Sequence, residues 1–366
     1  MAQESSSISK VAIIGGGPAG CMCAYYLQHD FDVTIFDLGS PLRTLLPTGG
    51  GRCNLAHAEY DFKELVKNYP RGEKFLYSVF SKFSTLDTIE FFEKIGVETY
   101  IQDDMRIFPV SNSAKYVREK FLKSLNKVRF VKEMVSKLDF NTYDYIVVAT
   151  GGHASYSLIE GHNIVKPKPA LVGLKTDEIF PPGISLKKVT SCGFVDDLLF
   201  THEGVSGPLI YKISSINARK DFPYKINLDF CGEIDLQCLL DKNSQKSIKN
   251  LLSDLIPKGF VTHLLRKFSI DENIKCHKIN GKMRDQILNS LNHYEITITG
   301  TSKHGEVVTC GGVSLDDIDS RTMQSKITPN LYFCGEVLDI DGFCGGFNLQ
   351  NCWSTAFVAA QSILSR

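Results

Sequence analysis

The sequence of 366 residues has no excess of charge of either sign. Its 41 Lys and Arg residues equal its 41 Asp and Glu residues, so the formal net charge is zero. A protein whose main partner is nucleic acid or an anionic membrane usually carries a basic excess, so we expect neither partner. The chain also lacks a run of about 18 uncharged apolar residues, the length that a membrane-spanning helix needs. Its first ten residues contain no apolar signal segment, and we therefore expect a cytoplasmic protein.

The 11 cysteines include no C-x-x-C pair. Scattered cysteines in odd number do not match the framework of a disulfide-rich or zinc-binding domain, so we expect no metal site. We interpret most of them as reduced core residues. Cys53 and Cys344 remain candidates for chemistry, because both lie in glycine-rich segments.

The most informative stretch is Lys10 to Asp37, which has the pattern of a dinucleotide-binding βαβ unit. An apolar strand leads into the motif GGGPAG, formed by Gly15, Gly16, Gly17, Pro18, Ala19 and Gly20. Its glycines permit a tight turn, a close approach to a pyrophosphate and close helix packing, and the N–H groups that begin the next helix bind the phosphates. Asp37 ends the second strand, where a carboxylate accepts the ribose hydroxyls. The motif does not decide between NAD and FAD.

Three further glycine-rich points follow along the chain. Gly49 to Gly51 precede Arg52, in a loop that suits a flat or anionic ligand but is also compatible with a flexible surface loop. The sequence ATGG ends the strand Tyr145–Ala149. A last strand, Leu331–Cys334, is followed by Gly-Glu, and Gly-Gly then begins the closing helix.

Between these points, the sequence predicts several elements by their caps and turns. Ser84 and Asp87 form a capping box for the helix Thr85–Ile95, and Ser111 or Ser113 caps a helix that ends near Leu125. A hairpin is expected from Val97–Gln102 and Met105–Phe108, around Asp103 and Asp104. Short strands are expected at Val189–Phe194, Leu198–Thr201 and Tyr224–Phe230, and a hairpin joins Tyr294–Thr299 to Glu306–Thr309 through SKHG.

The fold class is therefore α/β, with a Rossmann-like dinucleotide-binding domain and an insertion of short strands with a helical cap. Residues 1–166 and 310–366 form the two parts of the dinucleotide-binding domain. Residues 167–234 and 293–309 form the strand-rich part of the insertion, and residues 235–292 form its helical part.

Six motifs span nearly the whole chain: GGGRCN from Gly49, RIFPVS from Arg106, KPALV from Lys168, FTHEGVSGP from Phe200, VTCGGVSLDDID from Val308, and GEVLDIDGFCGGFNLQ from Gly335. With these motifs in this order, the sequence resembles the BaiN/RdsA-like family of FAD-dependent oxidoreductases, also called YhiN-like or aminoacetone-oxidase-type flavoproteins. The resemblance implies that the Rossmann-like domain is of the two-dinucleotide type and that the insertion consists of a small β-barrel and a helical subdomain.

The resemblance implies FAD, with its pyrophosphate at the first glycine motif and its adenosine ribose at Asp37. The implied contacts beyond that motif are Leu38, Gly51, Arg52, Cys53, Met134, Val135, Ala149, Thr150, Gly151, Gly335, Glu336, Asp341, Gly345, Gly346, Phe347, Asn348 and Leu349. Met134 and Val135 would lie near the adenine, and residues 345–349 would approach the flavin from a helix N-terminus, whose dipole stabilises reduced flavin. The segment Gly151–His162 is shorter here than in the family.

The chemistry of the protein side stays open. In a flavoenzyme the cofactor carries the hydride, so the chain needs to supply position, electrostatics and one proton donor. Arg52 is a candidate for steadying negative charge, and Cys53 with Cys344 is a weaker candidate for thiol catalysis. The histidines in or near motifs, His153, His202 and His304, are more typical of structural or surface residues than of general acids. A proton donor among them, or at Tyr156, stays open until geometry is available.

We expect an FAD-dependent oxidoreductase that acts on a small organic metabolite. Only one G-x-G-x-x-G motif is present, so NAD(P)H would dock in the substrate cleft to reduce the flavin and then leave. One alternative is an oxidase that passes electrons to oxygen. Another is a flavin-bound redox sensor or interaction protein with little turnover, because the shortened Gly151–His162 segment leaves a substrate lid in question. The sequence does not indicate an oligomeric state.

Overall fold

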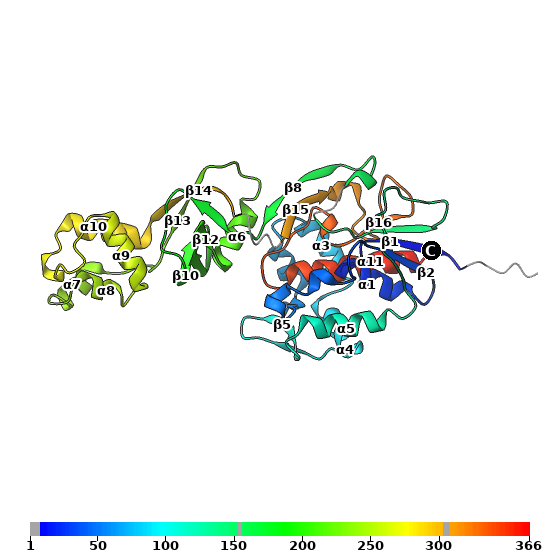
Figure 1. The fold of residues 1–366 in the computed structure, drawn as a ribbon, viewed down its shortest axis with the longest axis horizontal. Coiled ribbons are helices and arrows are strands. Elements are labelled where there is room, and N and C mark those ends of the chain that lie inside the picture. The colour runs from blue at the N-terminus through cyan, green and yellow to red at the C-terminus, as the bar shows by residue number, and fades with distance from the viewer. Residues whose placement is uncertain (1–7, 153–155, 303–307) are drawn as a thin grey trace, which may run out of the picture. The chain divides into compact units, whose positions relative to one another are not determined.

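The computed structural model describes residues 8–152, 156–302 and 308–366. The chain divides into two compact units (Figure 1). The first consists of Met1–Lys168 and Val308–Arg366, and the second of Pro169–Val307. Among the described residues, no helix combines the length and apolar composition needed to cross a membrane.

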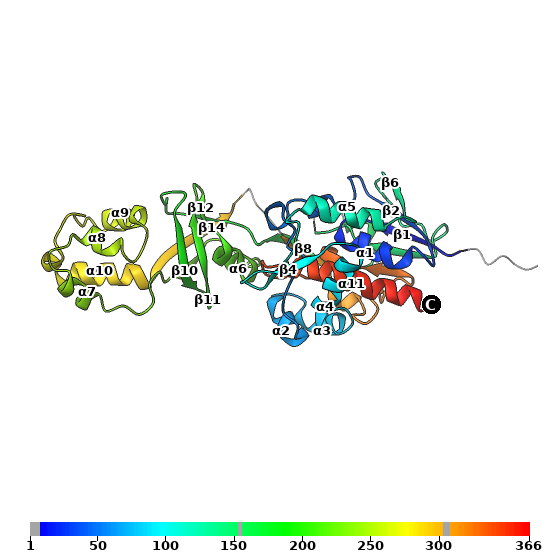
Figure 2. The same ribbon diagram turned by 90° about the horizontal axis from the view of Figure 1, so that it is seen from below.

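A five-stranded parallel sheet forms the centre of the first unit. Its strands lie in the order β16 (Leu331–Phe333), β7 (Tyr145–Val148), β1 (Lys10–Ile14), β2 (Asp32–Phe36) and β6 (Arg129–Val131). The central strands are apolar on both faces, as expected for a sheet covered on both sides. Helices α1 (Pro18–Leu27) and α11 (Phe347–Leu364) pack against each other, so the two ends of the chain complete one domain (Figure 2).

The Rossmann-like α/β class predicted from the sequence is thereby confirmed in the first unit. The remaining elements of this unit are a three-stranded antiparallel sheet in the order β3 (Ala56–His57), β5 (Arg106–Pro109), β4 (Thr99–Ile101), the pair β8 (Ile164–Ala170) and β15 (Val308–Val313), and helices α2 (Phe62–Leu65), α3 (Glu73–Phe80), α4 (Thr85–Lys94) and α5 (Ala114–Ser124). Short 3₁₀ turns occur at Arg43–Leu45, Thr48–Gly51, Val66–Asn68, Tyr156–Leu158, Leu315–Asp317 and Gly335–Val337.

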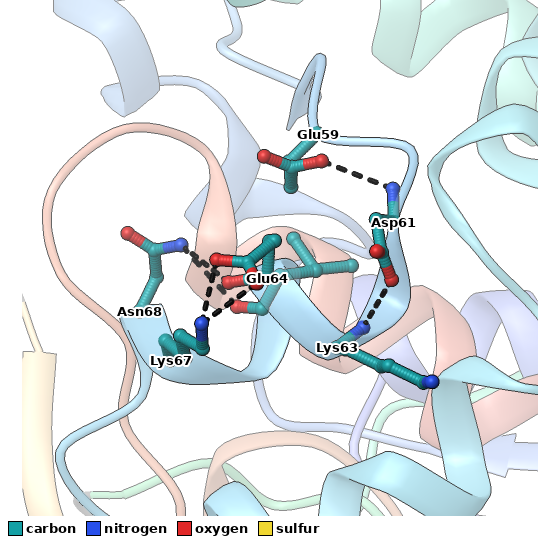
Figure 3. Close-up of polar contacts among 7 residues, drawn as sticks. Glu59, Asp61, Lys63, Glu64, Lys67 and Asn68 are labelled. Carbon is teal, nitrogen blue, oxygen red and sulfur yellow. Dashed lines mark hydrogen bonds and ion pairs between the residues drawn. The ribbon is translucent and has the colours of Figure 1, made fainter.

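Local polar side chains determine where these helices begin. Ser84 and Asp87 form the expected capping box of α4, and Ser113 caps α5 through the Tyr116 N–H. At α2, the Asp61 carboxylate accepts the Lys63 N–H at 2.8 Å (Figure 3). The expected hairpin around Asp103 and Asp104 is present as β4 and β5. These predictions succeeded because caps and turns are decided by neighbours in the sequence.

The second unit contains a six-stranded antiparallel sheet and a group of helices. The strand order is β10 (Ser185–Ser191), β11 (Phe194–Phe200), β12 (Gly204–Ser206), β9 (Leu174–Thr176), β14 (Tyr294–Thr301) and β13 (Tyr224–Leu228). Paired backbone hydrogen bonds between Thr190 and Asp229 join the two outer strands, so the sheet closes on itself. The helices are α6 (Pro208–Ile216), α7 (Leu236–Lys242), α8 (Ile248–Leu252), α9 (Lys258–Lys267) and α10 (Gly281–Asn292) (Figure 1).

Two strand predictions in this region need correction. The expected strand Val189–Phe194 is interrupted, because Cys192 and Gly193 both have positive φ and form the turn between β10, which ends at Ser191, and β11, which begins at Phe194. The expected hairpin after Tyr294 does not form either. β14 pairs with β9 and β13, whereas β15 pairs with β8 in a different sheet. The sequence located both strands, but the local pattern of a strand does not indicate which partner it takes.

A polar cluster in the second unit connects α9 to the sheet. The Glu178 carboxylate accepts hydrogen bonds from the Tyr294 hydroxyl at 2.6 Å and the Lys267 ammonium at 2.8 Å, and it lies 2.8 Å from His263 Nε2. Partial burial acts to raise the pKa of Glu178, but the hydrogen bonds from His263, Lys267 and Tyr294 outweigh it and lower the pKa to about 2.

This cluster makes the stability of the protein depend on pH. The pKa of Glu178 is lower in the folded state than in the unfolded chain. The ionised carboxylate therefore stabilises the fold fully at pH values above its ordinary pKa, and this stabilisation is lost as the pH falls towards 2. We expect Glu178→Gln to lower the free energy of unfolding by about 1–2 kcal/mol at pH 7, after allowing for solvent screening. Urea unfolding at pH 7 and pH 3 measures this difference, which should shrink at pH 3. An equal difference at both pH values would contradict the assignment.

Candidate functional site

The first βα turn brings backbone groups unusually close together. A methyl group on Gly20 would lie 1.9 Å from the Gly15 carbonyl oxygen, and one on Gly15 would lie 2.3 Å from the Ala149 oxygen. Gly17 precedes α1 with an extended backbone, and Pro18 begins the helix. Within the described ranges, no side chain caps the N-terminus of α1. The N–H groups of this first turn are therefore available to a phosphate.

Asp37 lies beside this turn. Its carboxylate accepts the Gly16 N–H at 2.7 Å and the Gly39 N–H at 2.6 Å. These two bonds hold the carboxylate in place and leave lone pairs for further donors such as ribose hydroxyls. Leu38 is exposed next to it. Met134, also exposed, and half-buried Val135 follow β6, the neighbour of β2 in the sheet.

Glycine-rich segments follow the carboxyl ends of three adjacent strands of the sheet, β1, β7 and β16. Gly15 after β1 contacts Ala149 after β7, and a methyl group on Gly335 after β16 would lie 2.7 Å from Ala19 Cβ. The structure thus brings together residues that the sequence separates by more than 300 positions. Ligands of open α/β sheets bind at this edge. Thr150 continues this edge, and Gly151 has positive φ with no heavy atom of the described chain within 4 Å of a Cβ position.

The Glu336 side chain points towards β15. Its Oε1 atom accepts the Thr309 N–H at 2.8 Å, which connects the turn after β16 to β15. Tyr156 is nearby, and its hydroxyl donates to the Gly152 carbonyl at 3.3 Å. Burial raises the pKa of Tyr156, and the charges of Glu336 and Asp339 raise it further. Tyr156 is therefore a neutral hydrogen-bond donor at ordinary pH.

The triple-glycine loop is a left-handed turn with one packed and two open positions. Gly49, Gly50 and Gly51 all have positive φ. A methyl group on Gly49 would lie 2.8 Å from the Phe108 ring, whereas Gly50 is open and Gly51 nearly so. The Arg52 guanidinium lies 4.2 Å from the centre of the same ring, an arrangement that favours a fixed cation.

The two candidate cysteines differ in environment. Cys53 is buried, and this burial raises its pKa to about 12 although a bond with Thr48 acts in the opposite direction. Its thiol is protonated at physiological pH and is a poor nucleophile. Cys344 is exposed in the turn before α11. His202 is exposed in the second unit, and His153 and His304 lie outside the described residues.

The N-terminus of α11 is the second helix end in the site. Gly345 and Gly346 have positive φ, and a methyl group on Gly346 would lie 2.4 Å from the Ala56 oxygen. The described chain places no capping side chain and no acidic residue in the first turn, which includes Leu349. The N–H groups of this turn therefore carry an uncompensated positive partial charge.

Two of the expected contact residues here also support the turn itself. Asn348 Oδ1 accepts the Gly342 N–H and Asn348 Nδ2 donates to the Gly342 carbonyl, both at 2.8 Å. Asp341 is fully buried, and both of its carboxylate oxygens accept hydrogen bonds from Arg71. A buried carboxylate with a bidentate arginine partner is costly to break, so this pair fixes the path of the chain into α11.

Several residues of the site were not singled out from the sequence. His57 Nδ1 lies 3.2 Å from the Gly345 carbonyl oxygen, and the Tyr69 hydroxyl donates to the Phe347 carbonyl at 2.6 Å. Asn54 is buried in the GGGRCN motif, and its side-chain oxygen has no hydrogen-bond partner among the described residues. The position of Asn54 inside a motif was the available signal. Nothing local marks His57 or Tyr69, because their partners lie almost 300 residues away.

Together these residues fit a dinucleotide with a flavin ring. The uncapped start of α1 suits a pyrophosphate, and the uncapped start of α11 suits a ring that gains negative charge. The fixed carboxylate of Asp37 suits a ribose, and the open glycine positions leave room for the cofactor. The unsatisfied Asn54 oxygen is a free acceptor for a ring N–H. In the described part of the chain, no group of three His, Cys, Asp or Glu side chains could hold a metal ion.

Comparison with known proteins agrees with this description. The family description "HI0933-like protein Rossmann domain" matches residues 9–362. The chain is 28% identical to a ribosomal RNA dihydrouridine synthase of Escherichia coli, over 96% of this chain and 97% of that protein. It is 29% identical to a protein of the same name from Haemophilus influenzae, over 98% and 99%. It is 26% identical to a 3-dehydro-bile acid delta(4,6)-reductase of Clostridium scindens, over 98% and 100%.

The match covers nearly the whole chain and includes both glycine-rich ends of the site. The resemblance inferred from the motifs is thereby confirmed. The chain belongs to the HI0933-like Rossmann-domain family and is a flavoprotein of the FAD-dependent oxidoreductase class.

Proposed function

We propose that the protein is a reductase that saturates a carbon–carbon double bond conjugated to a carbonyl group, with NAD(P)H as electron donor. The observation that carries the proposal is the uncapped N-terminus of α11, whose N–H groups favour a negatively charged, reduced flavin. The names of the relatives support it, because dihydrouridine synthesis and delta(4,6) reduction both describe addition of hydrogen to a double bond.

The residues of the chain have separate tasks in such a reaction. Bound FAD supplies the hydride transfer. The N–H groups at the start of α1 would bind its pyrophosphate, and Asp37 would accept hydrogen bonds from its ribose. Gly345 and Gly346 let the turn before α11 pack against Phe347, His57 and the backbone of Ala56, which would hold the first N–H groups of the helix in place for the ring. Arg52, held against Phe108, would in this proposal stabilise negative charge on the substrate carbonyl.

The substrate has two candidates within this reaction. A small enone-like metabolite is consistent with the zero net charge of the chain. The uracil ring of ribosomal RNA is the second candidate, since the names of two full-length relatives specify it. The charge distribution favours RNA locally, because residues 235–292 carry ten Lys or Arg residues and six Asp or Glu residues.

The donor and substrate are tested by anaerobic titration of the purified protein. We expect NADH or NADPH to bleach the visible flavin absorbance in stoichiometric amounts, and a conjugated enone or a uracil-containing ribosomal RNA fragment to restore it. Saturated analogues of both substrates serve as controls. Bleaching by dithionite alone would exclude the pyridine nucleotide donor. Rapid reoxidation by air, together with reduction by an amine, would indicate an oxidase instead.

The packing of the first turn predicts the effect of one methyl group on cofactor binding. Gly20→Ala forces α1 away from Gly15, so we expect the affinity for FAD to fall by about 100-fold, or roughly 2.7 kcal/mol. The matched control is Gly281→Ala in α10, where no described heavy atom lies within 4 Å of the new methyl group. The FAD content and dissociation constant measure the effect. A Gly20→Ala protein with full flavin content would contradict the assigned site.

The high pKa of Cys53 predicts that the reaction does not use its thiolate. We expect Cys53→Ala to keep turnover within about threefold of wild type, at a stability cost of about 1 kcal/mol for the small cavity. Cys344→Ala, at an exposed position, should likewise keep turnover. Steady-state rates from pH 6 to 9 provide the measurement. A loss of several orders of magnitude in either variant would establish thiol catalysis.

A further inference from the structure

We propose that His57 is a positioning residue that orients the Gly345–Gly346 peptide so that its N–H group faces the flavin. The inference rests on the flavin site proposed above and gives a role to a histidine outside the expected contact residues. His57 lies on β3, where it pairs with Arg106 of β5, and it reaches the turn before α11 from a distant part of the sequence.

Two contacts fix the imidazole against this turn. Nδ1 lies 3.2 Å from the Gly345 carbonyl oxygen, and the ring centre lies 4.6 Å from that of Phe347 at an angle of 31°. A carbonyl oxygen only accepts hydrogen bonds, so Nδ1 carries the proton in this contact. Burial lowers the pKa of His57 although the bond to Gly345 raises it, which leaves the ring neutral at pH 7.

The direction of the neighbouring N–H group follows from peptide geometry. In a trans peptide the carbonyl and the next N–H point in opposite directions. Because the Gly345 carbonyl points to His57, the Gly346 N–H points away from β3. The Phe347 carbonyl points to the Tyr69 hydroxyl at 2.6 Å, so the Asn348 N–H is directed away from Tyr69 in the same manner. The protein thus binds the carbonyl side of this turn.

Other anchors hold the rest of the turn without His57. Asp341 is paired with Arg71, the Phe343 N–H donates to the Asn68 carbonyl at 2.9 Å, and Gly342 is bonded to Asn348. Loss of the imidazole should therefore release one peptide rather than unfold the segment. This makes its effect measurable in the folded protein.

The consequence for the flavin is electrostatic. Reduced flavin carries negative charge at N1 and the C2 carbonyl, and a preorganised N–H group stabilises that charge more than it stabilises the neutral oxidised ring. Removing the anchor should weaken binding of reduced FAD more than binding of oxidised FAD. The ratio of the two dissociation constants therefore reports the role of His57.

The test compares His57→Asn with His57→Leu. Asn carries an amide nitrogen at the position of Nδ1, whereas Leu has a similar branched shape and no donor. We expect Asn to keep the ratio of dissociation constants for reduced and oxidised FAD within about twofold of wild type. We expect Leu to shift it by about three- to tenfold against reduced FAD, and tenfold corresponds to about 30 mV in the two-electron midpoint potential. Tyr69→Phe, which removes the other anchor, should shift the ratio in the same direction.

Dye-coupled reduction of each holoprotein gives these potentials without NAD(P)H or substrate. The midpoint potentials therefore still test the role of His57 if the proposed donor or substrate is wrong. An unchanged potential in His57→Leu, with circular dichroism showing a folded protein, would overturn the inference. So would an equal shift in His57→Asn, and so would a loss of turnover in both variants at unchanged potential, which would instead indicate proton donation by the ring.

Discussion

The structure depends on the contact between the backbone of Gly20 in α1 and the backbone of Gly15 at the end of β1. No side chain fits there, because even a methyl group would lie 1.9 Å from a carbonyl oxygen. This contact sets how deeply α1 packs against the sheet. It also decides where the first helix N-terminus lies relative to the carboxyl ends of β7 and β16. A pyrophosphate site made of backbone N–H groups requires a fixed distance between helix and sheet, because a backbone N–H group cannot change its position by rotation as a side chain can.

The N-terminus of α11 is also held at a fixed position, and here side chains take part. Around α11 the backbone is held by side chains that come from residues 57 to 71, an early part of the chain. His57, Tyr69 and Arg71 each bind an acceptor on the turn before or at the start of α11. These carbonyl and carboxylate oxygens of the turn thus have hydrogen-bond partners within the protein, and the N–H groups at the helix start keep their positive partial charge. A catalytic site of this kind needs few functional side chains, because the charge it offers belongs to the peptide bonds.

This arrangement changes how individual residues of the site are understood. Cys53 lies in a loop that suggests reactivity, yet burial keeps its thiol protonated. Asp341 lies in a motif expected to contact the cofactor, yet its carboxylate is occupied by Arg71. Asn54 is the opposite case, because it is buried with an unused acceptor beside residues that were expected to bind the flavin. In each case the assignment depends on the neighbours in space rather than on the motif.

The amino-acid sequence alone determined the α/β class, the first glycine motif with Asp37, the capped starts of α4 and α5, and the family. The glycine motif with Asp37 and the helix caps depend on residues within about 20 positions of each other, and local geometry restricts them strongly. The family follows from a set of such short motifs in a fixed order along the chain. Only the tertiary structure decided which strands pair, so the hairpin expected after Tyr294 was assigned to the wrong partner. It also decided which residues support α11, since His57 and Gly345 are 288 positions apart. The physical reason is that strand pairing and long-range anchoring follow from the packing of the whole core, which no local pattern encodes.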